Sequence, residues 1–123
     1  MGHKDDVMLA PFMFWRACKE LRFSPTVDMF ATTYYKHVER YYAPTMYPHA
    51  AGADAFAVNW QLERRPYTNS TWPLIGRVLR KIETDQVSVI VVALNWIWAP
   101  WFKLCKKLVR REIVIADPLF LDA

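Results

Sequence analysis

Apolar residues recur at two different spacings along the chain, and the alternation between the two spacings predicts helices and strands in turn. Helical spacing over residues 8–21 predicts a helix that starts near Pro11. The residues expected on its apolar face are Phe12, Trp15 and Cys18. Residues 26–31 (TVDMFA) then alternate with a period of two, which predicts a strand. Burying the charge of Asp28 inside this strand is costly, so its carboxylate is expected either to bond a loop N–H or to face a ligand.

Shorter apolar runs follow, separated by prolines. Residues 32–39 are expected to form a short helix or turn, and residues 40–43 (RYYA) a second strand. A loop at 44–53 leads to residues 54–60 (DAFAVNW), which are expected to form a short strand or one helical turn. This part of the chain is therefore predicted to be largely irregular.

Residues 65–82 (RPYTNSTWPLIGRVLRKI) predict the end of a short strand, a polar turn and a helix. The turn comprises Asn69, Ser70, Thr71 and Trp72. The apolar face of the helix is expected to hold Leu74, Ile75, Val78, Leu79 and Ile82. Its other face mainly carries Arg77, Arg80 and Lys81. Because α/β proteins bind ligands at the carboxyl ends of strands, this turn is the candidate site.

The pattern then returns to strand spacing. Thr84 and Asp85 are expected to form a turn, and residues 86–93 (QVSVIVVA) are the clearest strand, since near-continuous β-branched residues are typical of buried parallel strands. An aromatic loop at 94–100, a helix at 101–110 and a last strand at 112–116 follow.

Strands that alternate with helices predict an α/β domain with a small, mainly parallel sheet and flanking helices. We expect residues 1–22 to form an N-terminal helical extension, residues 23–116 the α/β domain and residues 117–123 a C-terminal tail.

Composition and charge narrow the classes of function. An apolar fraction of 54% excludes a disordered chain, and six Trp, six Tyr and seven Phe are more rings than so small a core can cover. The net charge of +4 fits contact with RNA, DNA or an anionic membrane without requiring any of them. Cys18 and Cys105 lack the spacing of zinc ligands, so no metal is expected.

The amino end (MGHKDDV) lacks the apolar stretch of a secretory signal, so we expect an intracellular protein and leave an organelle such as the mitochondrion open. Residues 87–102 are shorter than the ~20 apolar residues of a membrane span and include Asn95 and Pro100. The basic residues that follow leave contact with a membrane surface open.

Five segments stand in a specific order over residues 23–109: TVDMFAT, RYYAP, DAFAVNW, YTNSTWPLIGRVLRKI and VSVIVVALNWIWAPWFKL. In this order they resemble the Dam-like N6-adenine methyltransferase domain of DIRS-type, tyrosine-recombinase retroelements. The resemblance implies a truncated class I, Rossmann-like methyltransferase fold. It also implies that Asp28 lies near the methionine end of S-adenosylmethionine and Asp54 near the far side of that cofactor.

The turn at Asn69 corresponds to the Asn/Asp-Pro-Pro-aromatic motif of that family. In the motif, the Asn oxygen and the next carbonyl accept hydrogen bonds from the amine of a flipped-out base, and the aromatic ring stacks on the base. Here Ser70 and Thr71 replace both prolines, and their hydroxyls can bond locally instead. Trp72 is larger than the usual Tyr or Phe and is expected to fill the base pocket itself. Small residues after the last long strand are replaced by Leu94, Ile97 and Trp98.

These departures predict a retired active site that has become a packing surface. The first hypothesis is a non-catalytic, domesticated methyltransferase-like accessory subunit of a large assembly, such as an organellar ribosome or a respiratory complex, with no cofactor and with protein subunits as partners. One alternative is an active S-adenosylmethionine-dependent N6-adenine methyltransferase of DNA or RNA. Another is a basic nucleic-acid-binding module. The expected contact residues are Arg77, Arg80, Lys81, Lys103, Lys106, Lys107, Trp96, Trp98 and Trp101.

Overall fold

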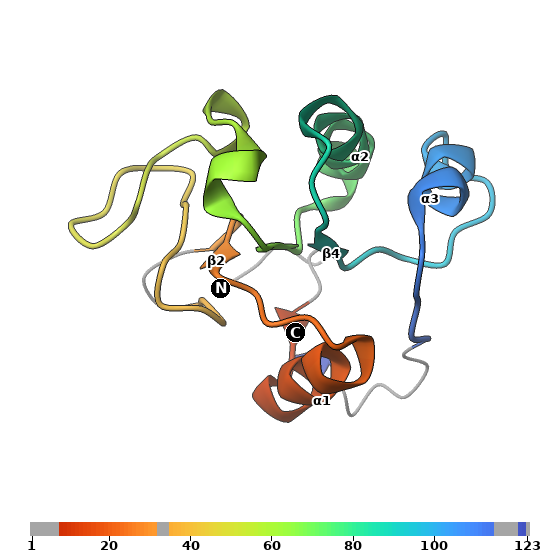
Figure 1. Cartoon of the computed structure of the whole chain (residues 1–123), viewed down its shortest axis with the longest axis horizontal. Helices are drawn as coiled ribbons and strands as arrows, with labels where there is room; N and C mark the ends of the chain where they lie inside the picture. Colours follow the sequence, from red (N-terminus) through yellow and green to blue (C-terminus); the bar gives the residue numbers. More distant parts are fainter. Residues whose placement is uncertain (1–7, 32–34, 115–120, 123) are drawn as a thin grey trace.

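The computed structural model of the chain describes residues 8–31, 35–114 and 121–122. Its centre is an open sheet of three short parallel strands in the order β2-β3-β4 (Figure 1). The strands are β2 (Val27–Asp28), β3 (Pro66–Thr68) and β4 (Ile90–Val91). Asp28 and Ile90 both pair with Tyr67, from opposite edges of β3. The middle strand is therefore the one that leads into the predicted turn at Asn69.

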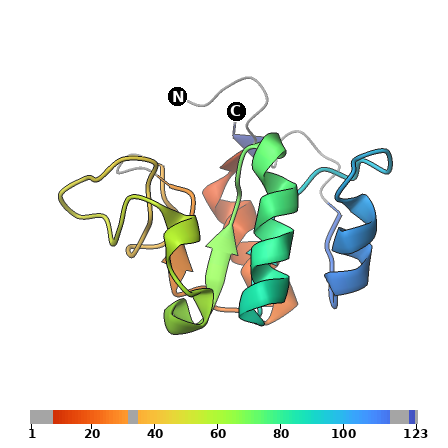
Figure 2. The same ribbon diagram turned by 90° about the horizontal axis from the view of Figure 1, so that it is seen from above.

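Helices flank both faces of this sheet (Figure 1, Figure 2). α1 (Pro11–Leu21) lies on one face and α2 (Ile75–Asp85) on the other, with α3 (Phe102–Leu108) beside α2. The prediction of a small α/β domain with a parallel sheet and flanking helices is confirmed. Its likeness to a methyltransferase stays a prediction.

The chain also forms a second, two-stranded sheet outside the parallel one. β1 (Met8–Leu9) pairs antiparallel with β5 (Leu121–Asp122), so Leu9 lies opposite Leu121. Residues 8 and 9 thus belong to a strand, and the helix begins at Pro11 as predicted. Within the predicted tail, residues 121–122 pair with the amino end, while residues 117–120 lie outside the described residues.

The core occupies both faces of the sheet, because successive strand side chains point to opposite faces. Towards α1 the buried cluster holds Leu9, Phe14, Cys18, Tyr67 and Ile90. Towards α2 the buried cluster holds Val27, Met29, Tyr42, Ala55, Trp60 and Val78. Strands of two or three residues are not stable alone, so packing of the two helices is what keeps the sheet together.

The apolar face of α2 is as predicted. Ile75, Val78 and Leu79 are buried, whereas Arg77 and Arg80 are exposed. The end of the helix differs from the prediction, since Thr84 and Asp85 belong to its last turn rather than to a loop.

The carboxylate of Asp85 explains this longer helix. It accepts a hydrogen bond from the backbone N–H of Trp60 at 2.9 Å and pairs with Lys81 Nζ at 2.9 Å. The first contact holds the end of α2 against Trp60, and the second stabilises the final turn from within the helix.

The apolar face predicted for α1 is wrong in part. The buried residues are Met13, Phe14, Ala17 and Cys18. Phe12 and Trp15 are instead 55% and 63% exposed. The helix carries large apolar side chains all round its first two turns, so spacing alone does not determine which of them meet the sheet. Two aromatic rings are therefore left on the outer side of α1.

The predicted strands are longer than the observed ones. Residues 40–43 form two isolated bridges, Asp28 with Tyr41 and Tyr42 with Gly52, rather than a strand. The strand predicted at 86–93 is limited to Ile90–Val91. This strand is an edge strand whose described neighbour, β3, is only three residues long, so most of the β-branched run has no ladder to join.

The remaining predicted elements have mixed outcomes. Residues 112–114 are not in a strand, and residues 115–116 lie outside the described part of the chain. Residues 35–39 are irregular, and residues 32–34 are not described. A 3₁₀ turn at Ala55–Ala57 confirms the helical alternative for residues 54–60, and a second 3₁₀ turn, Trp60–Glu63, begins at the end of this range.

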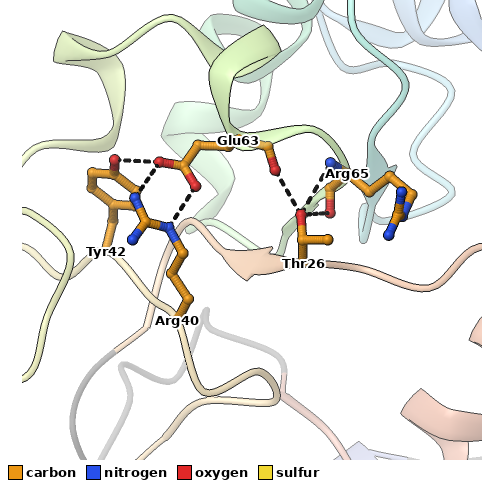
Figure 3. Close-up of polar contacts among 5 residues, drawn as sticks. All are labelled: Thr26, Arg40, Tyr42, Glu63 and Arg65. Atoms are coloured by element: carbon orange, nitrogen blue, oxygen red, sulfur yellow. Dashed lines mark hydrogen bonds and ion pairs between the residues drawn. The ribbon is translucent and has the colours of Figure 1, made fainter.

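A buried polar network anchors the irregular segment beside β2 to the chain before β3 (Figure 3). The Arg40 guanidinium donates two hydrogen bonds of 2.8 Å to the buried Glu63 carboxylate, and the Tyr42 hydroxyl donates another of 2.6 Å. The Arg40 hydrogen bonds hold the pKa of Glu63 below its usual range. The Thr26 hydroxyl donates to the Glu63 carbonyl at 2.6 Å and accepts from the Arg65 N–H at 3.1 Å. Glu63 therefore connects β2, β3 and the segment at 40–42.

Two glycines give a matched test of this packing. A Cβ on Gly52 would lie 2.6 and 2.9 Å from ring carbons of Tyr42, whose hydroxyl is fixed by Glu63. Gly52→Ala is expected to lower the free energy of unfolding by about 1–3 kcal/mol, because the buried ring cannot yield. A Cβ on Gly76, within α2, meets nothing closer than Trp101 Cβ at 3.6 Å.

Gly76→Ala is therefore expected to raise the free energy of unfolding by roughly 0.5–1 kcal/mol through helix propensity. Urea denaturation of the two variants and the wild type measures both effects. Equal effects of the two substitutions would contradict the packing described around Tyr42.

Candidate functional site

Two loops meet at the carboxyl edge of the sheet, where β3 and β4 end. Asn69, Ser70 and Thr71 follow β3 and lead into a 3₁₀ turn, Trp72–Leu74. The loop after β4 carries Trp96, whose ring centroid lies 5.2 Å from that of Trp72 at an interplanar angle of 60°. Such ring pairs contribute about 0.5–1.5 kcal/mol beyond the burial of their area. The aromatic residue of the turn thus packs against the neighbouring loop.

The polar groups of the turn are partly used within it. The Ser70 hydroxyl donates to the Thr71 carbonyl at 3.2 Å, and the Leu74 N–H donates to the same carbonyl at 3.0 Å. Thr71 precedes the 3₁₀ turn without a capping hydrogen bond from its side chain. Ser70 therefore forms the local bond that was expected of a hydroxyl in this position.

Asn69, Ser70 and Trp72 line a groove of about 990 Å³. Its other walls come from α1, α2 and α3, from the chain around β4 and from residues 110–114, and they are largely apolar. A groove of this size and character is typical of sites for small molecules. Asp28 and Asp54, the two acids assigned to a cofactor by the resemblance, do not line it.

Tyr67 brings a buried hydroxyl to the same region. Its ring packs edge-on against Phe14 and His37, with centroids 4.9 and 5.7 Å apart, and the residue lines the groove. Burial first, and the charge of Asp28 second, raise the pKa of the Tyr67 hydroxyl, and the nearby side chain of Asn69 opposes this shift. The hydroxyl oxygen is closed off from solvent. Tyr67 therefore places a buried hydroxyl next to Asn69, out of reach of a ligand unless the turn moves.

Asp28 is bonded to its own chain. Its side chain is buried, and its two carboxylate oxygens accept hydrogen bonds from the N–H groups of Phe30 at 3.3 Å and His37 at 3.1 Å. Burial raises the pKa of Asp28 to about 6, and the two backbone hydrogen bonds only partly offset this effect. The geometry corresponds to the first of the two predicted alternatives, a carboxylate bonded to loop N–H groups.

Asp54 lies elsewhere and is exposed. Its carboxylate accepts a hydrogen bond from the Phe56 N–H at 3.0 Å and so caps the 3₁₀ turn Ala55–Ala57. This contact is the ordinary one for an acid at the start of a helical turn. Both candidate cofactor acids therefore hold backbone N–H groups of their own chain.

The predicted basic residues lie on α2 and α3, and most of them already have a contact. Arg77 lies over the ring of Phe56, at 4.0 Å from the centroid. The ion pairs join Lys81 to Asp85, Lys107 to Glu83 and Lys106 to Glu112. Arg80 and Lys103 are exposed. These pairs reduce the positive charge that α2 and α3 offer to a polyanion.

The aromatic loop after β4 is largely exposed. Trp98 is 81% exposed, and Ile97 and Trp96 are also exposed, whereas Trp101 is half-buried. Together with Trp72, the exposed residues form an apolar surface that we call the tryptophan loop, consisting of Trp72, Trp96, Ile97 and Trp98. Large exposed side chains that stand together mark contact surfaces more often than isolated ones do.

Sequence reasoning missed two residues of this region, His37 and Tyr67. His37 comes nine residues after Asp28 in an irregular segment, and no spacing rule connects them. Tyr67 belongs to a strand of three residues, too short for its alternation to show which side chain is buried. Among the described residues, no group of three or more His, Cys, Asp or Glu side chains could hold a metal ion.

The raised pKa of Asp28 predicts a pH dependence of stability. A carboxyl whose folded pKa is about 6, against about 4 unfolded, stabilises the fold fully below pH 4, and the effect is lost as the pH rises through 6. The free energy of unfolding of the wild type, relative to that of Asp28→Asn, is expected to fall by roughly 2 kcal/mol between pH 4 and pH 7.5.

The matched control is Asp54→Asn, because Asp54 also accepts a backbone hydrogen bond but is exposed. The difference in free energy of unfolding between Asp54→Asn and the wild type should change much less with pH. Urea denaturation at a series of pH values measures both profiles. A profile of Asp28→Asn parallel to that of the wild type would contradict the cost assigned to the buried carboxylate.

The chain was compared with protein families, curated proteins and solved structures. No protein-family model, no curated protein and no solved structure matches the chain. Among the described residues, no helix is both long enough and apolar enough to span a membrane. The function must therefore be argued from the geometry of the site.

Proposed function

We propose that the chain is a methyltransferase-like α/β domain that does not catalyse methyl transfer and instead serves as an accessory subunit of a larger protein assembly. The observation that carries the proposal is the tryptophan loop. Trp72, at the position of the base-stacking ring, packs on Trp96, and Trp98 beside them is 81% exposed. A protein partner that covers this surface removes several large rings from water, each worth roughly 1.5–3 kcal/mol when fully buried.

The turn supports the same proposal. The two prolines that would stiffen it are replaced by Ser70 and Thr71, and the Ser70 hydroxyl bonds within the turn. Catalysis by positioning loses a large factor when reacting groups are held loosely. A turn of this composition is therefore better suited to packing than to presenting an amine.

The contacts of Asp28 and Asp54 also support the proposal of a non-catalytic domain. Both oxygens of Asp28 accept backbone N–H groups inside the protein, and Asp54 caps a helical turn. Asp28 is only 3% exposed, so a cofactor could reach its carboxylate only if the segments that cover it moved, at about 1–3 kcal/mol for each buried N–H left unpaired.

The alternative, an active S-adenosylmethionine-dependent N6-adenine methyltransferase of DNA or RNA, is favoured by one observation. The groove of about 990 Å³ beside Asn69 is large enough for a nucleoside-sized molecule. Binding of the methyl donor distinguishes this alternative from the proposal.

A pair of equally exposed residues tests the proposed contact surface. Trp98 and Leu62 are 81% and 80% exposed, so truncating either one costs little stability. In lysates of cells that express the tagged chain, the wild type and Leu62→Ala are expected to elute from a sizing column as a large complex. Trp98→Ala is expected to shift at least tenfold more of the chain to the monomer position, as loss of a central interface ring does.

The purified variants are compared by thermal denaturation, so that a folding defect is recognised. Elution of the wild type as a monomer, or of Trp98→Ala in the same complex as Leu62→Ala, would contradict the proposal.

A further inference from the structure

A second groove lies away from the turn at Asn69. It has a volume of about 660 Å³ and is lined by α1, by the turn after α1 and by residues 36–39. None of the residues proposed above for cofactor or partner contacts lines it. Its chemistry is therefore separate from that of the tryptophan loop.

The groove concentrates positive charge. Its lining includes Lys19, Arg22 and Lys36 and a single acid, Glu39, which gives a net charge of +2. The whole chain carries only +4. The ion pairs among the described residues do not involve Lys19 or Arg22, while Lys36 Nζ lies 3.5 Å from Glu39 and 4.9 Å from the centroid of the Tyr41 ring. Two or more cations are thus available to an anion here.

The exposed ring of Trp15 lines the same groove as these cations. Trp15 and Lys19 are four residues apart and lie on one face of α1, and Arg22 follows at the left-handed C-cap of the helix and lines the same groove. The Trp15 ring is 63% exposed and is braced by an edge contact with Phe14, at 5.2 Å between centroids. The ring therefore has a supported position and an open surface.

The opposite wall of the groove is fixed to the sheet. The His37 ring stacks on Phe14, with centroids 4.3 Å apart and an interplanar angle of 7°. The backbone N–H of His37 donates a hydrogen bond of 3.1 Å to the carboxylate of Asp28 in β2. These contacts fix the segment that carries Lys36, which lines the same groove as Lys19 and Arg22.

We propose that this groove binds single-stranded nucleic acid, with a base stacked on Trp15 and phosphates bound by Lys19, Arg22 and Lys36. A supported ring bordered by cations matches the alternation of flat bases and charged phosphates in a single strand. A duplex hides the faces of its bases, and an acidic peptide gains nothing from the ring. The inference goes beyond the proposed function, because it assigns a different ligand to a different surface.

The test uses the full chain and a short fluorescein-labelled oligothymidylate, with binding followed by fluorescence anisotropy at several salt concentrations. Trp15→Ala is expected to weaken binding roughly 5- to 100-fold through the loss of stacking, and Trp15→Phe to restore most of the affinity. Trp98→Ala, at an even more exposed ring of the other surface, should leave binding unchanged.

The charge on the groove is tested with two double variants that remove the same number of cations. Lys19→Gln with Arg22→Gln is expected to reduce the slope of log K against log salt by about 1.4, since two phosphate contacts are lost. Arg110→Gln with Arg111→Gln removes two exposed cations that follow α3 and should leave the slope as it is.

Three results would overturn the inference. They are unchanged affinity of Trp15→Ala, equal weakening by the two double variants, and equal competition by a duplex, a polyglutamate peptide or anionic vesicles. Because Trp15, Lys19 and Arg22 are exposed, circular dichroism is expected to show wild-type folding for every variant. The result for Trp98→Ala separates this inference from the proposed function.

Discussion

The structure depends on β3, a strand of three residues that is buried and is paired on both edges. On the face of the sheet that α1 covers, Tyr67 belongs to the buried cluster. On the face that α2 covers, Val27 of the neighbouring strand β2 belongs to the other buried cluster. The Arg40–Glu63–Tyr42 network fixes the chain just before this strand, and the turn at Asn69 leaves directly after it. So short a ladder contributes few hydrogen bonds, and the strand is held mainly by the side chains that cover it. The position of the candidate site follows from that burial.

Much of the fold could be predicted because the relevant signals are local. The spacing of Ile75, Val78 and Leu79 was sufficient for α2, since charged residues occupy its other face. The same reasoning failed for α1, where Phe12 and Trp15 compete with Phe14 for the buried side. Contacts between distant residues left no local signal. The bond between Arg40 and Glu63 joins residues 23 positions apart, and strand lengths at an open edge depend on what the neighbouring strand can pair with.

For the candidate site, too, the local features could be predicted from the sequence and the contacts between distant residues could not. The polar turn, its tryptophan and the acid in β2 were all identified from the sequence, and the turn lies at the carboxyl edge of the sheet. The sequence did not show that Asp28 is used by the N–H groups of Phe30 and His37, or that Tyr67 brings a buried hydroxyl beside Asn69. Both features depend on an irregular segment whose path is determined by packing. Aromatic packing at the turn and polar bonds around Asp28 together favour a surface that is covered by a partner.

Calorimetric titration of the full chain with S-adenosylmethionine tests this account most directly. If the rings and backbone bonds have replaced the methyl donor, the titration shows no saturable heat. A micromolar dissociation constant that Asn69→Ala weakens tenfold or more would contradict the account, because it would show that the groove beside the turn still holds the donor.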